Sequence, residues 1–164
     1  MNTRKGVVLA AVLVGSVAVA LGLAFPPLAV VDPGEYDTAT VTLRDDNGTS
    51  LATVDVRVAD TQEKRRIGLM RTESLENGSG MLFVHQRERT YTYHMRNMSF
   101  DIDILFVGPE GTVTVIHHAS APDPGEESDT YTGQGKYVLE VPRGYTNATD
   151  VDPGDRVEIP DDVA

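Results

Sequence analysis

The chain has 164 residues and a mass of 17.8 kDa, the size of one ordinary domain with an N-terminal extension. It contains no cysteine, which excludes disulfides, zinc–thiolate sites, iron–sulfur clusters and thiol nucleophiles. The formal net charge of −11 disfavours binding to nucleic acid through a basic face.

The N-terminus carries a long apolar segment. Two basic residues fall within residues 1–5, whereas residues 6–31 carry no charge. As a helix, the first 20 of these apolar residues would span roughly 30 Å, the thickness of the hydrocarbon core of a bilayer. The basic end should stay in the cytoplasm. We therefore expect a single-pass transmembrane signal anchor, with residues 32–164 outside the cytoplasm. The alternative is a cleaved signal peptide, with residues 18–20 (AVA) at the cleavage site and a secreted product.

The remainder of the chain is strongly acidic. Residues 32–40 contain Pro and Gly and are predicted to form a short linker, and residues 41–164 are predicted to form the extracytoplasmic domain. Without Arg4 and Lys5, the chain has 12 basic and 25 acidic residues, a net charge of −13. This excess, with two lysines, is typical of halophilic proteins; a merely acidic surface is the alternative. Outside the cytoplasm, four sequons would be usable for N-glycosylation, at Asn47, Asn77, Asn97 and Asn147.

Runs rich in β-branched and aromatic residues predict a mainly β domain. In chain order, we expect strands at residues 40–43, 51–58, 81–84, 90–95, 102–107, 112–117, 137–141 and 156–159. Asn47-Gly48 is a hairpin signal, and a helix is expected over residues 61–70 with Asp60 as its N-cap. Residues 123–135 are predicted to be a long acidic loop. The expected fold is a compact, mainly β (α+β), antiparallel barrel-like domain with one or two short helices.

Several segments, taken in order, are similar to one known family: RRIGLM at 65–70, GMLFV at 80–84, MRN at 95–97, DIDILFV at 101–107, KYVLEVP at 136–142 and GDRV at 154–157. Over about residues 53–159 the chain thereby resembles domain of unknown function 192 (DUF192). The resemblance implies a small β-rich fold with short helices, and no particular activity. Family members often carry a Trp where this chain has Tyr93-His94, and a pair of cysteines in the loop that here has none. Any role that needs a disulfide or a thiol therefore does not apply.

Four polar residues in or beside these segments form the predicted ligand site: Arg66, Asn97, Asp101 and Asp103. The two aspartates lie two apart in a strand-like run, so their carboxylates should point to one face. Arg66, which resembles an arginine of the family, is their natural partner, and Asn97 adds an amide that donates and accepts. A structural salt bridge between helix and sheet is the alternative interpretation.

We expect a membrane-anchored, extracytoplasmic module that binds a small ligand or an envelope partner, without a cofactor, rather than an enzyme. One alternative is an envelope hydrolase that uses Asp101 or Asp103 as a general base. A further alternative is a copper-binding module, because thioether and imidazole groups suit Cu(I) and several of them gather in one stretch of the chain: Met70, Met81, His94, Met95 and Met98. Methionines that simply fill the core are the competing interpretation.

Overall fold

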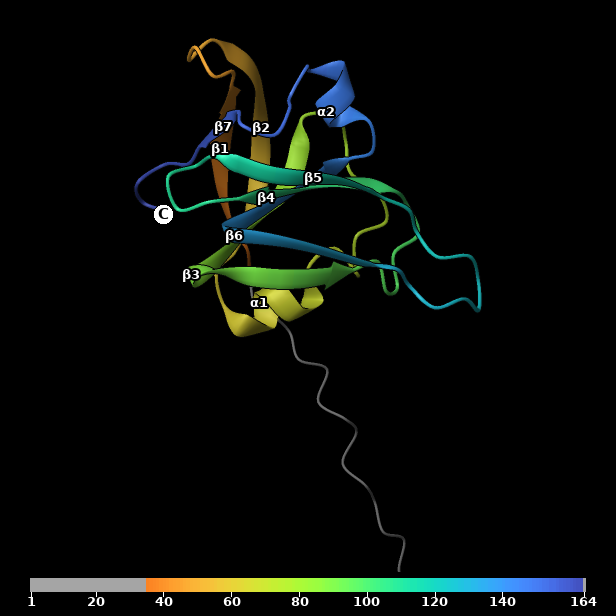
Figure 1. Cartoon of the computed structure of the whole chain (residues 1–164). Helices are drawn as coiled ribbons and strands as arrows, with labels where there is room; N and C mark the ends of the chain where they lie inside the picture. The colour runs from red at the N-terminus through yellow and green to blue at the C-terminus, as the bar shows by residue number, and fades with distance from the viewer. Residues whose placement is uncertain (1–34, 164) are drawn as a thin grey trace, which may run out of the picture. The chain divides into compact units, whose positions relative to one another are not determined.

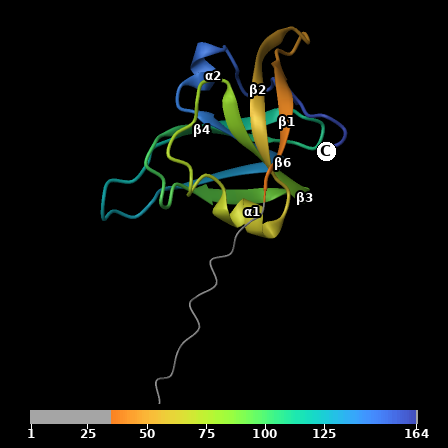
Figure 2. The same ribbon diagram turned by 180° about the vertical axis from the view of Figure 1, so that it is seen from behind.

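The computed structural model describes residues 35–163, and this part of the chain is mainly β (Figure 1). Its elements are β1 (Asp37–Arg44), β2 (Ser50–Ala59), α1 (Gln62–Ile67), β3 (Ser79–His94), β4 (Ile102–Val107), β5 (Val113–Ala119), β6 (Thr130–Pro142), α2 (Tyr145–Ala148) and β7 (Arg156–Glu158). The two helices lie on opposite sides of the domain in both views, α1 at the bottom and α2 at the top (Figures 1 and 2). The expected mainly β fold with few short helices is confirmed.

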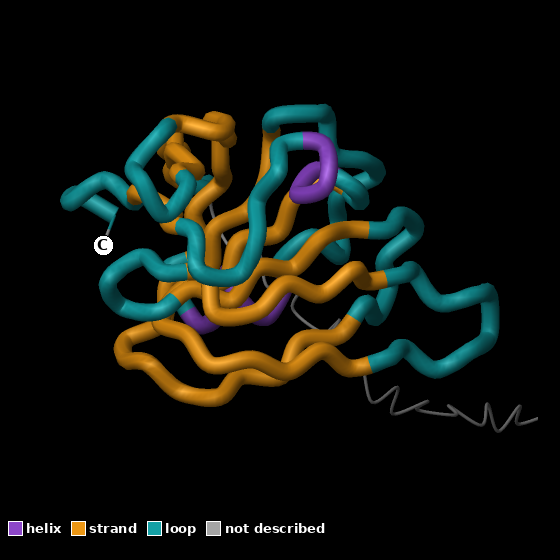
Figure 3. The backbone as a smooth tube through the Cα atoms, turned by 45° about the horizontal axis from the view of Figure 1, so that its top comes forward, coloured by secondary structure: helices purple, strands orange, loops and turns teal. Residues whose placement is uncertain are grey.

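The strands form one curved, barrel-like sheet in the order β5-β4-β6-β3-β2-β1-β7 (Figure 3). Every pair is antiparallel except β2 and β3, which run parallel because α1 lies between them in the chain. The two edges of the sheet meet at an isolated antiparallel bridge between Thr112 and Arg156. There the Val113 amide donates to the Asp155 carbonyl at 2.8 Å, and the Val157 amide donates to the Gly111 carbonyl at 2.8 Å. We call this bridge the seam of the barrel.

Alternate residues of the central strands supply two separate cores. Leu82, Leu105 and Leu139 pack with residues of β1, β2 and β7 in the first core. On the opposite face of β3, β4 and β6, a second core begins with Phe83 and Phe106, and its other fully or nearly buried members are Ala59, Leu69, Met81, Met95, Met98, Ile102, Ile104, Ala119 and Val138. The candidate pocket described below lies at this second core.

Helix α1 is shorter than the sequence predicted. Its N-cap is Thr61, whose hydroxyl accepts a hydrogen bond from the Lys64 amide at 3.1 Å, whereas Asp60 forms an ion pair with the Lys64 ammonium at 3.1 Å. The helix ends at Gly68, which adopts a left-handed φ of +50°. Predicting a helix to Met70 was therefore wrong, because the chain turns at Gly68 and sends Leu69 into the second core.

Strands β3 and β6 are longer than predicted, because the two runs expected at 81–84 and 90–95 belong to one strand. Residues 89–94 of β3 pair with residues 130–135 of β6, so the second half of the predicted acidic loop is strand. Between Val84 and Arg89 the register shifts in a bulge. The remaining loop, around residues 120–129, projects from the body of the domain (Figures 1 and 2).

The expected transmembrane segment, residues 6–31, lies outside the described residues. Within residues 35–163, no helix has the length and apolar character needed to cross a membrane.

Strand β1 begins at Asp37, three residues before the start that the sequence predicted.

Candidate functional site

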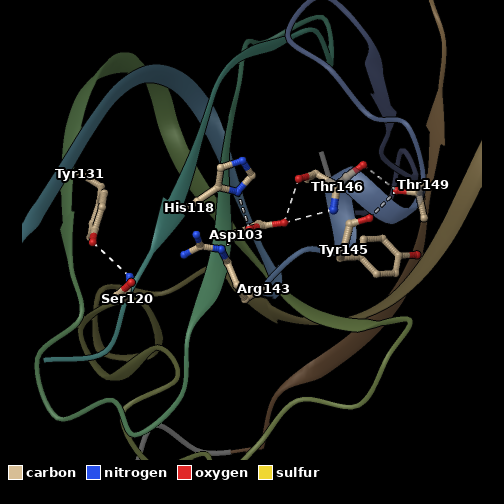
Figure 4. Close-up of polar contacts among 8 residues, drawn as sticks. All are labelled: Asp103, His118, Ser120, Tyr131, Arg143, Tyr145, Thr146 and Thr149. Carbon is tan, nitrogen blue, oxygen red and sulfur yellow. Dashed lines mark hydrogen bonds and ion pairs between the residues drawn. The ribbon is translucent and has the colours of Figure 1, made fainter. Parts of the chain in front are cut away.

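Asp103 lies at the centre of a polar cluster that joins β4 to α2 (Figure 4). Its side chain is fully buried, and its Oδ2 accepts hydrogen bonds from the Thr146 amide at 3.1 Å and the Thr146 hydroxyl at 2.8 Å. Its Oδ1 lies 2.7 Å from Nδ1 of His118 and 3.8 Å from Nε of Arg143. Because both oxygens are occupied, this carboxylate holds α2 against the sheet and is poorly suited to act as a general base.

Asp101 is exposed and stands just before β4. Its Oδ1 accepts a hydrogen bond from the Ala121 amide at 2.9 Å, which ties the start of β4 to the end of β5. Among residues 35–163, neither Asp101 nor Asp103 forms an ion pair with Arg66. The predicted pairing of Arg66 with the two aspartates is wrong, because α1 packs at the second core whereas Asp103 faces α2.

Asn97 and Arg66 lie at neighbouring but separate hollows. Asn97 has a left-handed φ of +59° in the turn after β3, and its Nδ2 donates to Sδ of Met70 at 3.9 Å. It lines a hollow of about 560 Å³ together with residues 122–128 of the projecting loop. Arg66 is exposed on α1 and lines a different pocket. The four predicted residues therefore do not form one site.

The pocket that Arg66 lines, which we call the α1 pocket, lies between α1 and the second core and has a volume of about 320 Å³. This size is within the range of small-ligand sites. Most of its lining is apolar or aromatic, contributed mainly by Ile67, Leu69, Met70, Phe83, Tyr91, Tyr93, Met95, Met98 and Ile102. A small polar set accompanies them: Gln62, Arg65, Arg66, His85, Thr92, His94 and Glu140.

Glu140 is the most unusual residue of the α1 pocket. It lies on β6 between Leu139 and Val141, and only 6% of its surface is exposed. No hydrogen bond or ion pair from another residue of 35–163 reaches its carboxyl group. Burial raises the pKa of Glu140 to about 8, so the carboxyl group is mostly protonated at neutral pH.

His85 and Tyr93 form a neutral pair on β3. The His85 Nε2 lies 3.0 Å from the Tyr93 hydroxyl, and the imidazole stacks on Tyr91 with 3.6 Å between ring centroids. Burial, and then the charge of Arg65, lower the pKa of His85 to about 4. Burial also raises the pKa of Tyr93 well above its usual value. At neutral pH, the pair therefore presents hydrogen-bonding groups without net charge.

Arg65 fastens α1 over the pocket. Its Nη1 donates to the carbonyl of Val84 at 2.7 Å and to the carbonyl of Asp60 at 2.5 Å. The Val84 carbonyl is at the bulge of β3, where the ladder with β6 is interrupted. Arg65 therefore satisfies a strand carbonyl at the bulge and fixes the helix to it.

The methionines partly converge on the α1 pocket. Met70, Met95 and Met98 line it beside His94, whereas Met81 is fully buried in the second core. No group of three or more His, Asp or Glu side chains in the described part of the chain is placed to hold a metal ion. A metal bound here would thus depend on thioether sulfurs, which favour soft ions.

Sequence reasoning missed Glu140 and the His85–Tyr93 pair. In the run YVLEV at residues 137–141, a glutamate interrupts an otherwise apolar strand of the sheet. A charged residue at such a position is costly to bury, so it is a signal of function that the sequence displayed. The pairing of His85 with Tyr93 depends on how the chain bends at the bulge, which has no comparable signal.

Comparison with known structures and families agrees with this architecture. A crystal structure of a protein from Sinorhizobium meliloti 1021, described as a proposed transcription regulator, is 29% identical and has a TM-score of 0.68. The match covers 76% of this chain and 95% of that protein. A protein of unknown function from Novosphingobium aromaticivorans DSM 12444 is 28% identical, with a TM-score of 0.66, over 74% of this chain and 85% of that protein. No curated protein matches the chain. The family model DUF192, described as "Uncharacterized ACR", matches residues 42–159, which is most of the chain, so the protein belongs to the DUF192 family.

Proposed function

We propose that the protein is a small-ligand binding module of the cell envelope and that the α1 pocket is its binding site. The observation that carries this proposal is the Glu140 carboxyl group, which is nearly buried, lacks a partner in the described part of the chain, and lines an apolar pocket. Among the described residues, no side-chain oxygen or nitrogen that is fully shielded from solvent lacks a partner, so the Glu140 carboxyl group is open to the pocket although burial removes most of its hydration. A ligand that donates a hydrogen bond to this carboxyl group would offset the cost of that lost hydration.

The chemistry of the pocket favours binding over catalysis. Its walls are apolar and aromatic with a few polar groups, the usual composition of a ligand site. Of the two carboxylates suggested as a general base, Asp101 does not line the pocket, and Asp103 is fully buried and already accepts three hydrogen bonds. A hydrolase that uses this residue would first have to break the cluster that holds α2.

The charge of the chain argues against the role described for the Sinorhizobium relative. A transcription regulator gains most of its affinity for DNA from cationic contacts to phosphates. This chain carries a net charge of −11, so DNA would be repelled. We therefore do not carry that role over to this protein.

We place the module outside the cytoplasm, held by the apolar segment at residues 6–31. The support is the length of the uncharged run and the two basic residues that precede it. The four sequon asparagines within the described part are all exposed, as glycan attachment would require: Asn47, Asn77, Asn97 and Asn147. Protease protection of the full-length chain in sealed vesicles tests this arrangement. Digestion of the domain from the cytoplasmic side would overturn it.

A thermal-shift screen of the full chain in detergent tests ligand binding. The panel contains amino acids, sugars, nucleotides, amines, carboxylic acids and metal ions. A ligand at a hundredfold excess over Kd stabilises the folded state by about 2.7 kcal/mol. We expect at least one class to raise the Tm, and Glu140→Gln to reduce that shift. The matched control is Glu73→Gln, which changes an exposed glutamate in the loop after α1. No shift with any class, or an equal shift in both variants, would contradict the proposal.

A second candidate, a carrier of Cu(I), is favoured by the three methionines that line the same pocket. Competition with a Cu(I) chelator, for the wild type and for a variant with Met70, Met95 and Met98 changed to Leu, distinguishes the two. Tight binding that is lost in the variant would establish the metal role. Failure of the wild-type protein to compete with the chelator for Cu(I) would contradict the metal role.

A further inference from the structure

The α1 pocket contains two ionisable side chains of opposite sign that have no partner within residues 35–163. Glu140 on β6 is 94% buried, whereas Arg66 on α1 is exposed. Both line the same pocket, and no ion pair joins them. The other guanidinium of the pocket, that of Arg65, is already bonded to two backbone carbonyls. The pocket thus has one free acidic and one free basic group.

We propose that the α1 pocket binds a small organic zwitterion, with the ligand's ammonium group on Glu140, its carboxylate on Arg66 and an apolar body against the wall between them. This inference rests on the proposed function and names its ligand class. A zwitterion satisfies both unpartnered groups in one binding event, whereas a simple amine or a simple acid satisfies one. A charged hydrogen bond contributes about twice as much as a neutral one.

The wall of the pocket suits the middle of such a ligand. Leu69, Phe83 and Met95 belong to the buried second core, and they offer apolar contacts. The volume of about 320 Å³ admits a molecule of amino-acid size and excludes a folded domain or a long polymer segment. Arg66 is exposed on α1 and lines the pocket, so a carboxylate can reach it while remaining partly hydrated.

Binding of the ammonium group would ionise Glu140. The titratable groups around it are Arg65 and Arg66 on α1, and His85, Tyr91, Tyr93 and His94 on β3. The pocket residue from β4, Ile102, is apolar. With Glu140 mostly protonated at neutral pH, the ligand's positive charge would displace that proton. Binding should therefore release a proton into the buffer.

The experiment is a titration of the full chain in detergent by isothermal calorimetry, with two matched ligand series. The first is leucine, leucinamide, 4-methylpentanoate and 4-methylpentanamide. The second is 6-aminohexanoate, hexylamine, hexanoate and hexanamide. Each series keeps the apolar body and removes the carboxylate, the ammonium group, or both, and the two zwitterions differ in the separation of their charges. Repeating the titrations in buffers of different ionisation enthalpy gives the number of protons released.

We expect at least one zwitterion to bind about tenfold or more tightly than every other member of its series. The reason is that each of the other members lacks at least one charged group and therefore loses at least one charged hydrogen bond. In Glu140→Gln, ligands that carry the ammonium group should bind no more tightly than their analogues without it. In Arg66→Gln, ligands that carry the carboxylate should bind no more tightly than their analogues without it. Arg89→Gln, at an exposed position on β3, is the matched control and should leave both differences in affinity unchanged.

The outcomes separate this inference from the proposed function. Equal binding by all members of both series, with a loss in pocket variants, would overturn the zwitterion and leave ligand binding in place. The same holds if only amines, or only metal ions, bind in a Glu140-dependent way. No binding here, together with no hit in the thermal-shift screen, would overturn both proposals.

Discussion

At the scale of single residues, Glu140 links the α1 pocket to stability. An ordinary glutamate has a pKa of about 4.5, whereas burial raises that of Glu140 to about 8. Between these values, the folded state holds a proton that the unfolded state has released. The contribution of Glu140 to the free energy of unfolding is therefore fully present below about pH 4.5 and is lost as the pH rises through about 8. The residue that we assign to binding thus weakens the fold at alkaline pH.

We expect Glu140→Gln to remove this pH dependence, since glutamine does not ionise. The variant should be more stable than the wild type at pH 8.5, by on the order of a few kcal/mol, and close to it at pH 5. Urea denaturation at the two pH values measures the difference. Parallel pH profiles for the two proteins would show that the carboxyl group is solvated in the folded state.

At the scale of elements, two glycines allow β6 to pass under the second core. Gly133 lies beneath the Phe106 ring, and a Cβ atom there would overlap the ring and come within 2.7 Å of Val115. Gly135 meets the backbone of Val107 in the same way, with a Cβ distance of 2.7 Å to the carbonyl oxygen. Because Phe106 packs edge-on against Tyr93 with a centroid distance of 5.7 Å, this close approach also positions a wall of the α1 pocket.

Gly133→Ala should therefore destabilise the fold by about 1–3 kcal/mol, the usual cost of overpacking a core. It should also disturb the aromatic ring signals of Tyr93 in an NMR spectrum, because Phe106 must move. Gln134→Ala, at the exposed neighbouring position, is the control and should do neither. An unchanged Tm for Gly133→Ala would contradict this packing, because Phe106 would then be able to move away from the added methyl group without a cost in stability.

At the scale of the whole molecule, the barrel depends on its seam. Gly111 has a left-handed φ of +84°, and a Cβ atom there would lie 2.5 Å from the carbonyl oxygen of Val157. Arg156 reinforces the seam, because its Nη2 donates to the Glu110 carbonyl at 2.6 Å. The side chain at position 111 thus decides whether the two edges of the sheet can meet.

We expect Gly111→Ala to open the seam and to lower the free energy of unfolding by more than about 1 kcal/mol. Gly125→Ala is the matched control, since Gly125 has a similar φ of +91° but no atom within 4 Å of a Cβ. Hydrogen exchange at the Val113 and Val157 amides measures the seam directly. Equal destabilisation by both variants would assign the effect to backbone strain alone.

The acid excess is also a property of the whole molecule. With a net charge of −11, repulsion between surface carboxylates opposes folding at low ionic strength. Because the Debye length falls from about 10 Å at 0.1 M to about 3 Å at 1 M salt, we expect the Tm to rise over this range of KCl. Thermal unfolding at several KCl concentrations measures it, with sucrose as an uncharged control. A flat Tm would contradict the expectation of a halophilic surface.

The sequence predicted those parts of the fold that depend on neighbouring residues. The hairpin of β1 and β2 follows from alternation around Asn47-Gly48, and β4 follows from its apolar run. The first half of β6 was missed, because Thr130 to Gly135 is strand only through its pairing with β3. Short-range patterns contain no information about such distant partners.

The candidate site, too, depends on contacts between distant parts of the chain that the sequence alone did not predict. Arg66, Asn97 and Asp101 are exposed, whereas Asp103 is buried and hydrogen-bonded. Packing places Arg66 on α1 and Asp103 beside α2, on opposite sides of the domain. Only the three-dimensional arrangement brings Glu140 of β6 beside α1, which lies more than seventy positions earlier in the chain.

The pairing of β7 with β1 has a consequence for how the protein is made. Thr42 lies opposite Glu158, so the first strand of the domain finds its outer neighbour more than a hundred residues later in the chain. A ribosome that has not yet released residue 158 therefore holds a chain whose barrel cannot close. Until that moment the edge of β1 remains open to other strands, and a chaperone that shields such edges would protect the nascent chain from aggregation.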